Sequence, residues 1–221
     1  MLLKILQTGF MGGKNIRKMS QYKLTYFNVK GLGEPIRFIF AYMGKEFQDN
    51  RISHEEWPQF KEKTPFGKMP FLEIDGKVYY QSVPILRYLA PQAGLAGKNA
   101  EEDLEIDMIA GAYGDLISEV TRYRRMENLI EKEKLRETFI NETVPFYMSK
   151  FETILKKNGG YLANGKLSWA DLYVVGHSSS LPGLIGYDLN ENYPFWKELT
   201  ERVYSVPGIK EWIKKRPEAV F

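Results

Sequence analysis

One tyrosine, Tyr26, occupies the place in this chain where chemistry is most readily expected. It lies in an alternating apolar run at 22–27, and a glycine-broken turn at 28–35 separates that run from an apolar helix at 36–43. A strand that feeds a helix through such a turn is a usual place for a reactive group, and a thiol oxidoreductase of this shape would carry a Cys-x-x-Cys pair there. The chain contains no cysteine. Sulfur chemistry would therefore use the thiol of another molecule, and the Tyr26 hydroxyl is the nearest group that could stabilise its thiolate.

Two dipeptides further along could bind an extended peptide ligand. Pro70 cannot continue a strand ladder, so Met69-Pro70 lies at a strand start or in a turn. With a cis bond the Met69 main chain would face outward and could pair with a peptide, whereas a trans bond would make it an ordinary strand start. Gln81-Ser82 lies at a predicted helix N-terminus, where main-chain N–H groups and the Ser82 hydroxyl could bind a carboxylate. Ser82 could equally be only the helix cap.

A second carboxylate site is predicted from a pair of residues earlier in the chain. Trp57 and Lys61 are four residues apart and would share one face of a helix. Lys61 could bind a carboxylate by its charge and Trp57 by its indole N–H, or they could be a solvated lysine beside a packed tryptophan. Together with the two dipeptides, this pair describes a groove for a small extended peptide with a carboxylate at each end. The middle of that peptide would lie near Tyr26.

The elements that would position these residues form an α/β part at 20–97, followed by an all-α part at 98–221. The alternation of apolar residues and the turn at Asp75-Gly76 indicate strands and helices in mixed order in the first part. The predicted strands are 22–27, 45–52, 70–74 and 77–80, the helices are 36–43, 55–61 and 83–89 with Ser82 as cap, and the linker is 91–97.

Only helices are predicted beyond the linker. Leu104, Met108, Ala112, Leu116 and Val120 recur at helical spacing and indicate a long helix from residue 101. Ser168-Trp-Ala-Asp171 has the outline of a capping box, with Asp171 as a structural cap rather than a catalyst. The other predicted helices are 132–157, 168–180, 193–204 and 208–215.

The composition is that of an ordinary globular chain of 221 residues, with 43% hydrophobic and 27% charged residues. No apolar run approaches the ~20 residues of a membrane span. The two histidines, His54 and His177, have no short-range acidic cluster around them, so no metal site is expected. The absence of cysteine suits a reducing compartment. Membrane, nucleic-acid and metal partners are therefore not predicted.

Residues 1–19 differ from the remainder. They contain four basic residues and no acidic one, which more than accounts for the formal net charge of +3. The segment lacks the apolar core and cleavage site of a secretory signal. It is predicted to be a disordered leader, either an alternative start or a cloning remnant with Met19 as the natural initiator, and a transit peptide is the less favoured alternative.

Taken together, the motifs of residues 20–221 make the chain resemble the sigma-class glutathione S-transferases, and it is similar to the insect members. The resemblance implies a thioredoxin-like domain followed by a helical domain, assembled as a cytoplasmic homodimer. The residues that carry it span nearly all of 20–221: 22–28, Gly33-Glu-Pro-Ile-Arg37, Pro65-Phe-Gly-Lys-Met-Pro70, 72–76, Gln81-Ser82, 104–108, 159–162, Ser168-Trp-Ala-Asp-Leu-Tyr173 and 212–217.

The resemblance also implies a role for individual residues. Tyr26 would be the catalytic residue and donate a hydrogen bond to the glutathione sulfur. Glutathione, as co-substrate, would be bound by Tyr26, Trp57, Lys61, Gly67, Lys68, Met69, Pro70, Gln81, Ser82 and by Asp115 across the dimer. The hydrophobic electrophile pocket would be formed by Phe27, Val29, Gly31, Leu32, Gly114, Ile117, Tyr173, His177 and Phe221. On residue type alone, His177 could instead be a packing histidine.

Departures from the vertebrate prostaglandin D synthases of that class narrow the expected activity. Leu32 stands where those enzymes have an arginine, and Gly111 and Gly114 stand where they have aspartates of a metal-sensitive dimer site. Prostaglandin isomerisation and metal activation are therefore not favoured, and an apolar pocket favours electrophiles such as lipid-derived enals in detoxification. A glutathione-dependent isomerase and a structural protein similar to the lens S-crystallins are the alternatives.

Overall fold

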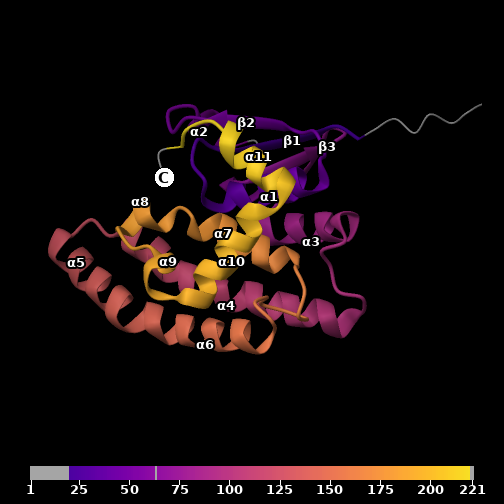
Figure 1. The fold of residues 1–221 in the computed structure, drawn as a ribbon. Helices are drawn as coiled ribbons and strands as arrows, with labels where there is room; N and C mark the ends of the chain where they lie inside the picture. Colours follow the sequence, from indigo (N-terminus) through magenta and orange to yellow (C-terminus); the bar gives the residue numbers. More distant parts are fainter. Residues whose placement is uncertain (1–19, 63, 220–221) are drawn as a thin grey trace, which may run out of the picture.

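The computed structural model describes residues 20–62 and 64–219, so the predicted leader at 1–19 and Phe221 lie outside the described residues. Strands and helices alternate in the first part of the chain, and helices alone follow (Figure 1). The elements of the first part are β1 (Tyr22–Phe27), α1 (Glu34–Met43), β2 (Gln48–Ile52), α2 (Trp57–Lys61), β3 (Phe71–Ile74), β4 (Lys77–Tyr80) and α3 (Ser82–Ala93).

The four strands form one mixed sheet in the order β2-β1-β3-β4. β1 pairs with β2 in parallel and with β3 antiparallel, so the strand that carries Tyr26 is central. The β3–β4 hairpin turns at Asp75 and Gly76, and both have positive φ, as a two-residue turn of this kind requires. Leu24 and Leu72 lie opposite each other on neighbouring strands and are fully buried. The predicted α/β order is therefore confirmed.

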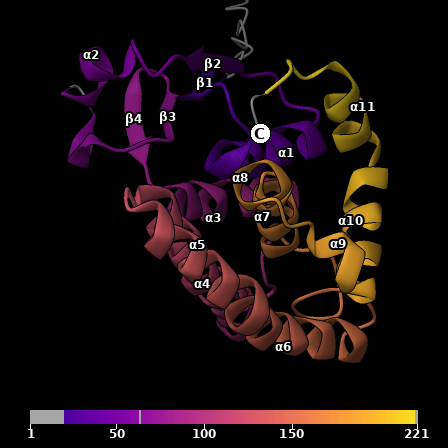
Figure 2. The ribbon, with the colours of Figure 1, turned by 90° about the vertical axis from the view of Figure 1, so that its left-hand side faces the viewer.

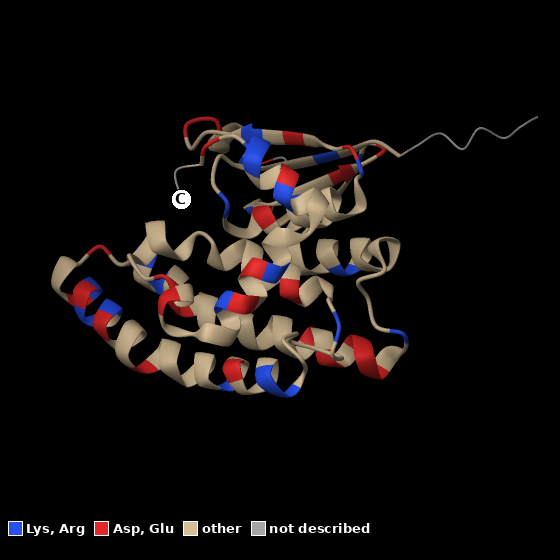
Figure 3. Cartoon of the chain, in the orientation of Figure 1, with Lys and Arg blue, Asp and Glu red and all other residues tan. Residues whose placement is uncertain are grey.

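The second part is a helical domain packed below the sheet domain (Figures 1 and 2). None of the described helices is long and apolar enough to cross a membrane. Both signs of charge are distributed along the outer helix α5 (Figure 3). The helices are α4 (Ala100–Arg125), α5 (Leu129–Thr138), α6 (Val144–Lys157), α7 (Trp169–Ser178), α8 (Leu181–Ile185), α9 (Leu189–Asn192), α10 (Pro194–Ser205) and α11 (Pro207–Lys215).

Helix α3 corrects two predictions about its ends. Ser82 is not the cap but the first helical residue, since Gln81 occupies the N-cap position with φ +72° and no side-chain capping bond. The helix also continues through Pro91 to Ala93, into the predicted linker. Pro91 lies in the last turn, where its missing N–H removes a single hydrogen bond. Leu89 and Ala90, buried immediately before it, tie that turn into the core.

Helix α4 confirms the predicted long helix, but only the second half of its predicted apolar row, Leu116 and Val120, is buried. Its buried residues include Ile106, Tyr113 and Leu116, whereas Leu104 and Met108 are 59% and 62% exposed. A row of residues spaced four apart drifts around a helix of 3.6 residues per turn, so the two ends of a long row face different directions. The first half of the row is therefore left on the surface.

The segment predicted as one helix at 132–157 is continuous but not uniform. It begins at Leu129, because the Asn128 side chain accepts hydrogen bonds from the N–H groups of Ile130 and Glu131. A π-helical turn, Phe139–Thr143, separates α5 from α6 and ends just before Pro145. Proline cannot donate to the preceding turn, and the wider π turn accommodates it at the start of α6.

The predicted capping box of α7 is confirmed. The Asp171 carboxylate accepts hydrogen bonds from the Ser168 main-chain N–H at 2.7 Å and from the Ser168 hydroxyl at 2.9 Å. Its other oxygen accepts from the Leu162 N–H at 3.0 Å, which ties the preceding loop to the helix start. α7 then packs against α1, so the turn before α1 lies at the boundary between the sheet and the helical domain.

Candidate functional site

Tyr26 lies near the end of the central strand with its ring against the turn that follows. A Cβ atom on Gly31 would lie 2.8 Å from the Tyr26 oxygen, and one on Gly33 would lie 2.6 Å from Tyr26 Cδ1. Neither distance is possible for a real side chain, and Gly31 also has φ +40°. The glycines predicted from the turn pattern are therefore required by close approach to Tyr26. Gly31, expected in the electrophile pocket, is buried beneath the tyrosine ring.

The Tyr26 hydroxyl is positioned to act as a hydrogen-bond donor. Its oxygen accepts a hydrogen bond from the Leu32 main-chain N–H at 3.3 Å. Burial raises the pKa of Tyr26, and the Leu32 N–H and the positive charges of Arg37 and Arg124 offset this only in part. The hydroxyl consequently keeps its proton at neutral pH. The Leu32 N–H occupies one of the two lone pairs of the oxygen, and the O–H remains available to donate to an anion.

An aromatic cluster stands beside Tyr26. Phe27 stacks on His54 with ring centroids 4.3 Å apart, and it packs edge-to-face with Trp57 with ring centroids 5.8 Å apart. The structure thus brings Trp57, predicted for glutathione, next to Phe27, predicted for the electrophile. His54 was missed by the sequence reasoning. Its one signal is its position two residues beyond β2, the strand that pairs with the Tyr26 strand.

The segment between α2 and β3 brings several predicted peptide-binding residues together. A Cβ on Gly67 would lie 3.3 Å from Lys61 Cγ, so the two positions are adjacent. The Met69-Pro70 peptide bond is cis, which is the alternative under which the Met69 main chain could pair with a peptide. The ring centroids of Phe66 and Tyr80 are 5.3 Å apart, which places this segment beside the end of β4, just before α3. The side chains of Lys61, Lys68 and Gln81 are exposed to solvent.

Gln81 has an unusual backbone for a residue with a side chain. Its φ of +72° and ψ of 117° turn the chain sharply into α3. Such conformations are costly for residues other than glycine and gather at functional sites. The first N–H groups of α3 are thereby presented at a helix N-terminus, a favourable place for an anion. Asp115, predicted to act across a dimer, is exposed on α4.

The residues predicted to line the electrophile pocket divide into two groups. Leu32, Phe27 and Gly114 are partly exposed, whereas Val29, Ile117, Tyr173 and His177 are buried. The buried residues can form the floor of a pocket but present little surface. A separate hollow of about 1190 Å³ lies between the start of β1, the end of α1 and α11, and none of the candidate residues lines it.

His177 is held inside the helical domain by its neighbours. Its Nδ1 lies 3.0 Å from the Tyr113 hydroxyl, and burial lowers the pKa of His177 to about 4. The imidazole is therefore neutral near pH 7. This arrangement corresponds to the packing alternative left open by the sequence, with Tyr113 as its polar partner.

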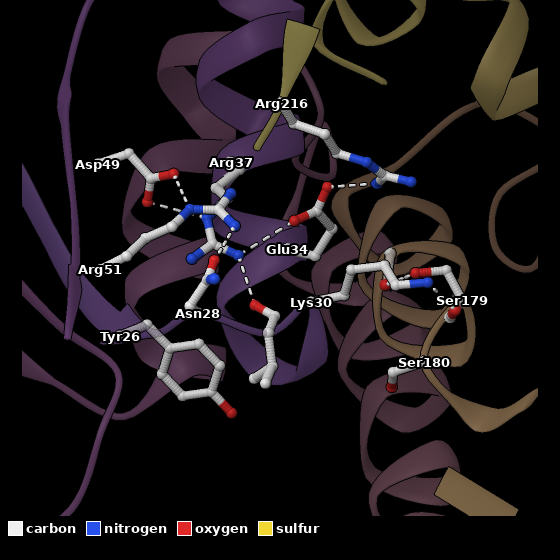
Figure 4. A network of polar contacts seen from close by, with 12 residues as sticks. Tyr26, Asn28, Lys30, Glu34, Arg37, Asp49, Arg51, Ser179, Ser180 and Arg216 are labelled. Atoms are coloured by element: carbon white, nitrogen blue, oxygen red, sulfur yellow. Dashed lines mark hydrogen bonds and ion pairs between the residues drawn. The ribbon is translucent and has the colours of Figure 1, made fainter. Parts of the chain in front are cut away.

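A buried ionic network supports the turn that carries the site, and the sequence reasoning did not find it. It joins Glu34 and Arg37 of α1 to Asp49 and Arg51 of β2 and to Arg216 after α11 (Figure 4). Its partners are up to 182 residues apart in the sequence. Within the described ranges, no group of three or more histidine, aspartate or glutamate side chains could hold a metal ion.

Comparison with known proteins places these features in context. Residues 22–91 match the family model "Glutathione S-transferase, N-terminal domain", and residues 114–216 match "Glutathione S-transferase, C-terminal domain". The chain is 43% identical to a glutathione S-transferase of Anopheles gambiae, covering 90% of this chain and 98% of the relative. It is 42% identical to glutathione S-transferase S1 of Drosophila melanogaster, covering 89% and 79%.

Solved structures give the same picture. Prostaglandin synthase D of Nilaparvata lugens is 48% identical, with a TM-score of 0.87 over 90% of this chain and 99% of that chain. Monomeric Na-GST-3, a glutathione S-transferase of the hookworm Necator americanus, is 36% identical, with a TM-score of 0.75 over 91% and 100%. The similarity extends over both the sheet and the helices.

Proposed function

The chain belongs to the glutathione S-transferase family, and from this premise we propose that it conjugates reduced glutathione to hydrophobic electrophiles through a thiolate stabilised by Tyr26. The observation that carries the proposal is the Tyr26 hydroxyl, which is kept protonated by burial and aimed by the turn beneath it. We further assign the chain to the sigma class and to the cytoplasm, as the motif resemblance and the lack of cysteine suggest.

The proposed chemistry begins with ionisation of the glutathione thiol. A free thiol has a pKa of about 8.5, so little thiolate exists near pH 7. A hydrogen bond from Tyr26 to the sulfur favours the charged form, and a fall of about two pKa units makes thiolate the major species. The thiolate then attacks the electrophile. With an enal, the S–C bond forms at the β-carbon and the α-carbon takes a proton from water.

We propose that glutathione lies along the segments that carry the predicted peptide-binding residues, with its sulfur beside Tyr26. Lys61 and Trp57 would bind the glycine carboxylate, by charge and by indole N–H. Gly67, Lys68 and the Met69-Pro70 main chain would lie along the cysteinyl residue. Gln81, Ser82 and the N-terminus of α3 would bind the γ-glutamyl carboxylate, and Asp115 of a second copy would bind its amine.

The electrophile would lie against the helical domain on the other side of the sulfur. Phe27, Leu32 and Gly114 offer partly exposed surface, and the buried residues Val29, Ile117 and Tyr173 would form the floor. Such a lining favours apolar substrates, for which lipid-derived enals are the proposed class. A glutathione-dependent isomerase is the second candidate, because a chain named as a prostaglandin synthase D is 48% identical to this one.

Assembly as a homodimer is proposed from an apolar surface formed by β4, α3 and α4. Tyr79 stacks on Tyr88 with ring centroids 6.2 Å apart, and Arg87 bonds to Asp107 at 2.9 Å, so these elements form one continuous face. Met108 and Leu104 extend it. Contiguous exposed apolar surface of this kind marks an interaction site.

The test is the rate of glutathione consumption with chlorodinitrobenzene near neutral pH, for the wild type beside Tyr26→Phe. Loss of a hydrogen bond to a charged group costs about 1.5–3 kcal/mol, so kcat should fall by about 10- to 100-fold while KM for glutathione changes little. Equal rates in the two proteins would remove Tyr26 from the mechanism. Product analysis separates the two candidate functions, since an isomerase requires glutathione without consuming it.

A further inference from the structure

Glu34, the first residue of α1, is the centre of an unusual set of contacts. Its side chain is fully buried and accepts three hydrogen bonds. The donors are Trp212 Nε1 at 2.9 Å, Arg216 Nη1 at 2.6 Å and Arg37 Nη1 at 3.1 Å. Figure 4 shows the two arginines on either side of the Glu34 carboxylate. Two of the three donors come from the end of the chain, so Glu34 joins α1 to α11 and to the residue that follows it.

Arg37 passes this connection to the turn after β1. Its side chain is also fully buried, and the same Nη1 atom that bonds Glu34 donates to the Val29 carbonyl at 2.9 Å. Its Nε donates to Asp49 at 2.9 Å, which fixes the guanidinium plane. The position of Arg37 Nη1 thus sets the position of the Val29 main chain.

The position of the turn after β1 then determines where the Tyr26 oxygen lies. Leu32, three residues beyond Val29, donates its N–H to that oxygen at 3.3 Å. Gly31 and Gly33 touch the tyrosine ring so closely that even a Cβ atom could not be added. A displacement of the turn must therefore change either the ring position or the Leu32 hydrogen bond, because no free space separates them.

Arg216 is the partner that balances Arg37 across the Glu34 carboxylate. Arg37 Nη2 is buried and has no hydrogen-bond partner among the described residues. If the Arg216 charge were removed, the Glu34 carboxylate could turn toward this free donor, and Arg37 Nη1 would leave the Val29 carbonyl. A buried charge that loses one partner rearranges in this way because an unpaired charge is costly.

Resting on the proposed role of Tyr26, we propose that Arg216 is a positioning residue for catalysis. Through Glu34, Arg37 and the Val29 carbonyl it holds the turn that aims the Tyr26 hydroxyl at the glutathione sulfur. The residue lies beyond the last helix and belongs to neither the glutathione-binding nor the electrophile-binding residues assigned above. Its contribution would be to the ionisation of the thiol rather than to the affinity for glutathione.

The experiment compares Arg216→Met and Arg216→Lys with the wild type. The readouts are kcat, KM for glutathione, and the pKa of enzyme-bound glutathione, measured from thiolate absorbance against pH. For Arg216→Met we expect the thiol pKa to rise by about one unit and kcat near pH 6.5 to fall by about five-fold, with KM within about two-fold. Arg216→Lys retains the charge and should recover part of both effects.

Arg202→Met is the matched control. Arg202, like Arg216, joins segments far apart in the sequence, but it lies within the helical domain and donates to the Gly159 and Gly160 carbonyls at 3.1 and 3.0 Å. It should lower thermal stability without moving the thiol pKa. An unchanged thiol pKa in Arg216→Met would overturn the inference, and if the methionine variant does not fold, an unchanged thiol pKa in Glu34→Gln would overturn it. If Tyr26→Phe leaves the thiol pKa unchanged, the proposed function fails instead.

Discussion

Tyr26 and Gln81 show how single residues are held in conformations that local preference does not favour. The Tyr26 ring lies on two glycines, and Gln81 turns the chain at φ +72° although it carries a side chain. In Tyr26 the arrangement aims a hydroxyl. In Gln81 it presents both a side chain and the first N–H groups of α3. Strain of this kind persists where the surrounding structure enforces it.

Replacing Gln81 by glycine should separate stability from binding. Glycine adopts positive φ without strain, so Gln81→Gly should raise the free energy of unfolding by about 1 kcal/mol. The lost amide should raise KM for glutathione by several-fold. Denaturant unfolding and steady-state kinetics check the two effects. A destabilised variant with unchanged KM would contradict both the strain and the binding role.

His177 should make stability depend on pH. Its folded pKa of about 4 lies below the unfolded value of about 6.5, so the unfolded chain binds the proton more tightly. The contribution of His177 to stability is then fully present above pH 6.5 and is lost as the pH falls toward 4. At pH 5.5 the loss is about 1.4 kcal/mol. Denaturant unfolding at pH 8 and 5.5 should show a smaller difference between the two pH values in His177→Gln.

His54 provides the matched control, because it is the only other histidine and is exposed. His54→Gln should keep the wild-type difference between pH 8 and pH 5.5. If both variants keep it, the acid sensitivity arises from other groups.

At the scale of elements, the N-terminal caps of the helices differ in how much they contribute to the stability of the protein. The α7 start is buried, and Asp171 satisfies three donors there, two of them from Ser168. The α5 start is exposed, and Asn128 satisfies two N–H groups that water could otherwise reach. Loss of the buried cap should therefore destabilise the protein more than loss of the exposed cap, because a buried donor without a partner is not compensated by water.

Alanine substitutions at the two caps should show this inequality. Asp171→Ala should lower the free energy of unfolding by about 2–4 kcal/mol, and Asn128→Ala by about 1 kcal/mol. Denaturant titrations at one protein concentration compare them directly. Equal losses would mean that burial does not decide the strength of these caps.

At the scale of the whole molecule, the first half of the apolar row of α4 is exposed. Leu104 and Met108 continue the face formed by Tyr79 and Tyr88, and no described residue covers it. A stable protein interface buries about 800 Å² on each partner, for which a face made from a strand and two helices is suitable. The catalytic site would also depend on it, since Asp115 lies on the same helix.

A charge at the centre of this face should separate the subunits. Met108→Glu is expected to convert a dimer into a monomer, with a raised KM for glutathione, because a carboxylate would be buried without a partner. Light scattering after size-exclusion chromatography gives the mass. Leu129→Glu is the control, since Leu129 is 78% exposed on α5 and should leave the mass unchanged. A monomeric wild type would contradict the proposed assembly.

Much of this protein was determined by its sequence alone. The alternating run before Tyr26, the Asp75-Gly76 hairpin and the Ser168–Asp171 box act over a few residues, so their geometry follows from local preferences and steric limits. The lack of cysteine and the glycine turn after Tyr26 predict that the protein uses the thiol of another molecule and that a tyrosine stabilises it. The order of strands and helices then followed from periodicity.

Only the tertiary structure decided which side chains meet. Glu34 and Arg216 are 182 residues apart, and no local pattern pairs them. The buried face of α4 and the enclosure of His177 by Tyr113 likewise depend on which helices pack together. Periodicity identifies candidate apolar faces, but burial is a property of the assembled core. For the same reason the chemistry could be assigned to Tyr26 from sequence, while the contacts that aim its hydroxyl could not.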